Sequence, residues 1–126
     1  MNSEQYVEDV KKLESLIGPI GLYDGRKVDS RIVHAIIGLT TESGELQDAI
    51  KKNMFYGAKL DLVNHKEEAG DVLWYLAVLI DALGTTFEEV SNVNISKLKA
   101  RYPDKFDPER ALNRNLDKER EILENE

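Results

Sequence analysis

Apolar residues recur at helical spacing along nearly the whole chain, whereas sustained alternation of β-branched and polar residues is close to absent. Turn formers and capping residues divide this pattern into helical segments. The pattern therefore predicts an all-α fold. The predicted helices run from about Ser3, as N-cap, to Ile17, from Asp29 or Ser30 to Asn53, from Leu62 to Leu83, from a Thr86 capping box to Tyr102, and from Asp107-Pro108 to Leu123.

The faces of these helices predict how they pack. From Val72 to Ile80 the third helix is apolar on every side, so it lies either at the centre of a bundle or partly in a subunit interface, which we favour. The acidic last segment is expected to be a solvated tail helix that frays, on the basis of Glu119, Glu121, Glu124 and Glu126. On the second helix five apolar residues fall within one narrow arc and are expected to face the core: Ile32, Ile36, Leu39, Leu46 and Ile50.

Length and charge limit the classes of protein to which the chain can belong. A chain of 126 residues is the size of one domain, and we expect a single domain over residues 1–126. The net charge of −7 repels a phosphate backbone, so nucleic acid is not an expected partner. The absence of cysteine excludes disulfides, thiol nucleophiles and thiolate metal sites. No apolar run reaches the roughly 20 residues that span a bilayer, and no leader is recognisable, so we expect no membrane partner and a cytoplasmic location.

The chemistry that remains is that of carboxylates, because the chain has no GxSxG, GxGxxG or P-loop motif. Two acid pairs share the i,i+3 spacing that points both side chains to one side of a helix: Glu42 with Glu45, and Glu68 with Asp71. If the two helices pack antiparallel, the four carboxylates converge and need a cation. An all-oxygen site favours Mg²⁺, with Mn²⁺ as the other candidate. A single such pair is more often surface salt-bridge material, so that alternative stays open.

A second group of polar residues suits an anionic ligand. Asn94, Lys97 and Arg101 lie at i, i+3 and i+7 on the fourth predicted helix, where they can bind phosphates. A solvated helix face explains the same stripe equally well. Lys52 is a further phosphate candidate, although Lys51 and Lys52 at a helix end also complement the helix dipole.

Four motifs, taken in order, resemble those of the MazG-like nucleotide pyrophosphohydrolases, above all the single-domain versions of phages and bacteria. They are GLxxExGEL at residues 38–46, FYG at 55–57, EExGDVLWYL at 67–76 and NIxKLxxRYP at 94–103. The resemblance covers a motif core at residues 32–106 and, more weakly, the charged tail at 107–126.

The resemblance implies a four-helix-bundle-like all-α fold with an extra C-terminal helical segment, completed by assembly into dimers or tetramers. It implies Mg²⁺-dependent hydrolysis of the α–β phosphate bond of an NTP or dNTP to a nucleoside monophosphate and pyrophosphate. The implied metal ligands are Glu42, Glu45, Glu68 and Asp71, and the substrate-binding candidates are Lys97, Arg101, Asn94, Lys52 and Tyr75.

Several assignments stay open within this resemblance. Glu67 is an alternative to Glu68 as a ligand, and the general base is Glu45 or Glu42. Tyr56, Trp74 and Tyr75 are candidates for stacking on a base. A related all-α pyrophosphatase would act on dUTP or a phosphoribosyl nucleotide instead. From another class, a non-catalytic helical oligomer would bind a nucleotide or a protein partner, and it would show no metal dependence.

Overall fold

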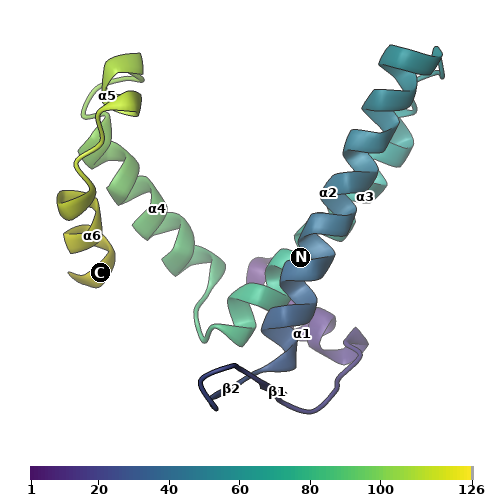
Figure 1. Cartoon of the computed structure of the whole chain (residues 1–126), viewed down its shortest axis with the longest axis horizontal. Coiled ribbons are helices and arrows are strands. Elements are labelled where there is room, and N and C mark those ends of the chain that lie inside the picture. Colours follow the sequence, from purple (N-terminus) through teal and green to yellow (C-terminus); the bar gives the residue numbers. More distant parts are fainter. Residues whose placement is uncertain (126) are drawn as a thin grey trace. The chain divides into compact units, whose positions relative to one another are not determined.

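Helices account for most of residues 1–125, which the computed structural model describes, so the all-α prediction is confirmed (Figure 1). The chain divides into two compact units, Met1–Thr85 and Thr86–Glu126. The first contains α1 (Ser3–Leu13), β1 (Ile20–Gly21), β2 (Lys27–Val28), α2 (Ser30–Tyr56) and α3 (Leu62–Ala82). The second contains α4 (Phe87–Arg101), α5 (Pro108–Leu112) and α6 (Leu116–Asn125).

The first unit is built on α2 and α3, which lie side by side and are joined by the short connection at residues 57–61 (Figure 1). The Asp29 side chain caps α2, and the Asp61 side chain caps α3 by accepting from two backbone N–H groups. At the end of α2 the chain turns through Gly57, whose φ of 70° is unfavourable for other residues. The connection is too short for anything but an antiparallel pair.

The contact between α2 and α3 is made by small residues. Ala35 and Gly38 on α2 are buried, as are Ala77 and Val78 on α3. The predicted core face of α2 is therefore wrong in part. Its members Ile36 and Ile50 are exposed, while Ile32, Leu39 and Leu46 are only partly buried. The small residues Ala35 and Gly38 take the buried positions of α2 instead, and Gly38 leaves room for the Tyr75 ring of α3.

Helix α1 packs against α3 and ends earlier than the sequence suggested, at Leu13 instead of Ile17. The next residue, Glu14, has an extended backbone, and its carboxylate accepts from the guanidinium of Arg31. The Ser30 hydroxyl donates to the Ile17 carbonyl oxygen at 2.7 Å. These bonds to the start of α2 replace the last helical turn that was expected of α1.

Two local details of the first unit also differ from expectation. Asn2, not Ser3, caps α1, its side chain accepting from a backbone N–H. Between α1 and α2 the chain forms a two-residue antiparallel hairpin, in which Ile20 pairs with Val28. Such short strands carry no readable alternation, so the sequence pattern did not reveal them.

The second unit begins with the predicted capping box of Thr86 and Glu89 at the start of α4. The predicted tail helix is instead two helices, because the backbone leaves helical geometry at Asn113. Helix α6 packs on α4, and Glu119 is buried there between Arg101 and Arg114. The expectation of a solvated tail is therefore wrong for Glu119, whereas Glu121 and Glu124 are exposed as expected and Glu126 lies outside the described residues.

Large apolar side chains stay exposed along the second half of α2 and at the start of α3. An open groove of about 370 Å³ runs along α2, lined by Leu46, Ile50, Met54 and Phe55 together with polar neighbours. Leu62 is exposed at the start of α3. Over residues 1–125 no single helix has the length and apolarity to cross a membrane, and one bent pair, α3 with α4, passes on length and composition alone.

Candidate active site

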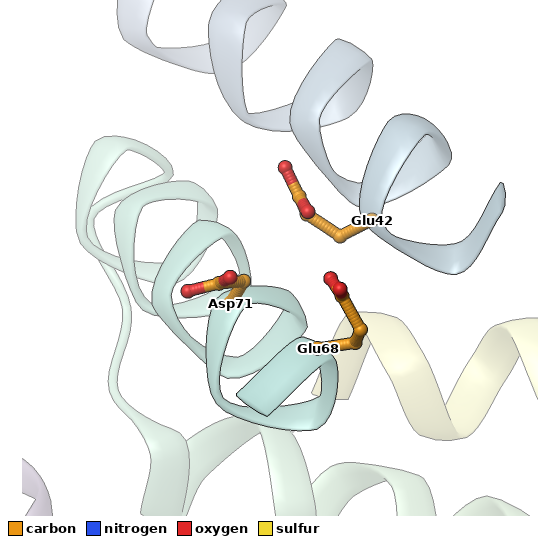
Figure 2. A group of neighbouring side chains, drawn as sticks. All are labelled: Glu42, Glu68 and Asp71. Carbon is orange, nitrogen blue, oxygen red and sulfur yellow. The ribbon is translucent and has the colours of Figure 1, made fainter. Parts of the chain in front are cut away.

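Three carboxylates from two helices come together in the first unit. Glu42 projects from α2 towards Glu68 and Asp71 on α3 (Figure 2). One oxygen from each lies within 4.8 Å of those from the other two. The i,i+3 spacing of Glu68 and Asp71 places them on one face of α3, and the packing of α2 on α3 brings Glu42 to that face. Glu45, the fourth predicted ligand, is exposed and lies outside this group.

The surroundings of Glu42 disfavour its charged form. Burial, and then the charges of Asp71, Glu68 and Glu45, raise the pKa of Glu42 above that of an ordinary glutamate. The Nδ2 of Asn64 donates to Glu68 at 3.0 Å, which fixes that carboxylate. The group offers only hard oxygen ligands and carries excess negative charge, so its donor set fits Mg²⁺ or Mn²⁺.

Two of the three carboxylates, Glu42 and Asp71, line a pocket that also has apolar walls. It has a volume of about 430 Å³ and is lined by Leu13, Glu42, Asp71, Trp74 and Tyr75. This volume lies in the range of small-molecule sites. Carboxylates that can bind a cation therefore lie beside an aromatic and aliphatic surface that can bind an organic group.

The aromatic wall is held in place by packing. A Cβ atom added at Gly38 would overlap the Tyr75 ring, so this ring lies directly on the backbone of α2. His34 meets the ring of Tyr75 edge-on with centroids 5.4 Å apart, and Trp74 does so at 5.0 Å. Tyr75, predicted to bind substrate, therefore lines the pocket in a position fixed from three sides.

The predicted phosphate ligands on α4 belong to the second unit. Asn94 is exposed and Lys97 is partly buried. Nε and Nη2 of Arg101 donate to the two carboxylate oxygens of Glu119 at 2.8 and 2.7 Å. Two N–H groups of Nη1 and one of Nη2 are left over by this pair. Lys52, at the far end of α2, pairs with the neighbouring Asp48.

Sequence reasoning missed three residues that bear on these groups. Asn64 precedes Glu68 by four positions on the same helix, so the i,i+4 spacing was a usable signal. Leu13 reaches the pocket only through the packing of α1 on α3, and no local pattern indicates that. Glu119 resembled any other acidic residue of the tail.

Comparison with known proteins identifies the family. Residues 34–106 match the model of the MazG nucleotide pyrophosphohydrolase domain. The matched range includes the three clustered carboxylates and the three polar residues of α4, Asn94, Lys97 and Arg101. Neither a curated protein nor a solved structure matches the chain. Because the match covers more than half of the chain, this protein belongs to the MazG nucleotide pyrophosphohydrolase family.

Proposed function

We propose that this protein hydrolyses the α–β phosphate bond of nucleoside triphosphates, giving a nucleoside monophosphate and pyrophosphate, in a reaction that requires Mg²⁺. The observation that carries the proposal is the convergence of Glu42, Glu68 and Asp71 at the side of a pocket with an aromatic wall. Family membership supports the reaction class, and the oxygen-only donor set supports the metal.

Glu42, Glu68 and Asp71 would hold the cation, with Glu45 nearby on α2. A divalent cation bound there supplies positive charge that offsets the phosphates and acidifies an attacking water. Glu42 or Glu45 would accept the proton of that water. Whichever of the two is not fully engaged with the cation would suit this role, because its carboxylate stays free to accept a proton.

The remaining predicted residues would bind the substrate. Tyr75 and Trp74 offer flat apolar surface to the base. Lys97 and the N–H groups of Arg101 that Glu119 does not engage would bind phosphate oxygens, with Asn94 and Lys52 in support. The α4 residues belong to the second unit of the fold. Their role is therefore proposed from the order of the family motifs along the chain.

The experiment compares the wild-type protein with Glu68→Gln and Glu67→Gln on a panel of NTPs, dNTPs and dUTP, with and without Mg²⁺. Phosphorus products are identified by ³¹P NMR. We expect pyrophosphate and monophosphate only with metal, and a loss of about 100-fold or more in Glu68→Gln. The matched control Glu67→Gln removes the neighbouring exposed acid, which lies outside the cluster, and should stay active.

The same panel separates the alternatives. Loss of activity in Glu67→Gln but not in Glu68→Gln would show that Glu67, not Glu68, is the metal ligand. Release of orthophosphate would contradict the assigned bond, and preference for dUTP alone would favour the related dUTP-hydrolysing activity. No metal-dependent turnover of any nucleotide would favour a non-catalytic binding protein.

A further inference from the structure

Helix α1 contributes to the pocket although it lies outside residues 34–106, the part of the chain that matches the family. Its last residue, Leu13, lines the pocket beside Glu42 and Asp71. Val10 of α1 is buried against the rest of the unit, and α1 packs on α3, the helix that carries Asp71. The wall that α1 supplies is therefore a feature of this chain that the shared family region does not contain.

The backbone next to Leu13 is firmly anchored. The Glu14 side chain is only 3% exposed, and its two oxygens accept from Nε and Nη2 of Arg31 at 2.7 and 2.6 Å. Nη2 of Arg31 also donates to Asp81 of α3 at 2.7 Å. One guanidinium thus ties the end of α1 to the start of α2 and the end of α3.

The Leu13 side chain itself is 73% exposed, so it has few packing contacts of its own. Tyr75, by contrast, is held by Gly38 and His34. An exposed leucine beside a pocket, fixed only through its backbone, is free to contact a ligand.

The chemistry of a nucleotide indicates which part meets this wall. Its phosphates need the cation held by the carboxylates, whereas the flat faces of its base are apolar and pack on aromatic or aliphatic surface. In this pocket that surface consists of Leu13, Trp74 and Tyr75. We propose that Leu13 is a specificity-determining residue that contacts the nucleoside part of the substrate, and that the Glu14–Arg31 ion pair is the positioning device that holds it. This inference rests on the proposed function.

The test measures kcat and KM of the full-length protein for the four dNTPs with Mg²⁺. We compare wild type with Leu13→Ala and with Leu16→Ala. Leu16 is a matched control, since it is 67% exposed but does not line the pocket. In Leu13→Ala we expect KM to rise about three- to tenfold with kcat within about twofold, and the ranking of the four bases to change. Leu16→Ala should behave as wild type.

Glu14→Gln tests the positioning role. We expect the same rise in KM and the same change in base ranking, with kcat retained, in protein that thermal unfolding shows to be folded. A purely structural ion pair would lower stability and leave the base ranking unchanged, which would overturn the positioning role.

Two outcomes overturn the inference in distinguishable ways. If the wild type turns over dNTPs while Leu13→Ala matches Leu16→Ala in KM and base ranking, the inference is wrong and the proposed function stands. If the wild type itself gives no metal-dependent pyrophosphate, the proposed function fails and the inference fails with it.

Discussion

The missing side chain at Gly38 determines where the Tyr75 ring lies. The ring occupies the space that a Cβ atom would need, and it forms part of the pocket wall from there. Gly44 lies on the same helix, α2, but a Cβ added there meets nothing within 4 Å. The two glycines therefore have opposite expected responses to the same substitution.

We predict that Gly38→Ala lowers the free energy of unfolding by about 1–3 kcal/mol, because the new methyl group forces the Tyr75 ring out of place. Gly44→Ala is the control. It should be neutral or stabilising by up to about 1 kcal/mol, since alanine favours a helix over glycine. Urea unfolding followed by circular dichroism measures both. Equal stability of the two variants would contradict the described contact.

Local spacing predicts orientation within a helix but not every contact between helices. The i,i+3 spacing placed Glu68 and Asp71 on one face, and short connections implied the antiparallel packing that adds Glu42. Glu45 has the same spacing, yet it is exposed and lies outside the cluster, which the spacing alone did not indicate. The roles of all four as ligands stay predictions.

Among the helices, α6 shows most clearly how a buried charge orders a segment. Glu119 accepts from Arg101 at the end of α4 and from Arg114 just before α6. These two guanidinium groups lower the pKa of Glu119 to about 2. A short acidic helix that would fray alone is thereby fixed to α4.

We predict that Glu119→Gln releases α6 from α4, because Arg101 and Arg114 lose their shared counter-charge. Hydrogen exchange of α6 amides should become faster, on the order of tenfold or more, at neutral pH. Glu121→Gln, an exposed change on the same helix, is the control and should leave the exchange unchanged. Unchanged exchange in Glu119→Gln would show that apolar packing alone holds α6.

The same ion pairs set a pH dependence with a defined sign. Because folding lowers the pKa of Glu119 from 4.5 to about 2, its stabilising effect is complete above pH 4.5. It decreases as the pH falls through this interval and is lost below about 2. In the wild type, but not in Glu119→Gln, α6 should therefore exchange faster as the pH is lowered from 4.5 towards 2, after correction for intrinsic exchange rates.

Among the described residues, many large apolar side chains are exposed to solvent and few are buried in the core. The groove along α2 is bordered by Met54 and Phe55, and Ile36 and Ile37 are exposed on the same helix. An exposed apolar groove of this kind marks an interaction surface. We propose that a second copy of the chain covers it, in a dimer or tetramer as the family resemblance implies, although the sequence pattern placed the interface on α3.

We predict that the wild type sediments as a dimer or tetramer and that Phe55→Glu shifts it to monomer at micromolar concentration, because a buried unpaired carboxylate opposes association. Tyr23→Glu alters a fully exposed aromatic residue elsewhere and serves as the control. Analytical ultracentrifugation distinguishes the states. A monomeric wild type would contradict the assembly.

The sequence predicted the principal helices with errors of a few residues, because caps such as Asp29, Asp61 and Thr86 mark their starts. It did not predict the β1–β2 hairpin or the division of the tail into α5 and α6. Both depend on contacts between segments, such as that of Glu119 with Arg101, which no local pattern records. The expectation of a single domain stays a prediction beside the two units of the fold.

The guanidinium of Arg31 has a consequence for the order of folding events. Its bonds join residues 17 and 50 positions away along the chain, Glu14 and Asp81. Closing such long loops lowers the entropy of the chain, and this cost precedes any gain from the hydrogen bonds. The bonds can form only after α1, α2 and α3 have come into contact. We therefore expect these ion pairs to form late in folding and to slow the unfolding of the first unit more than they hasten its folding.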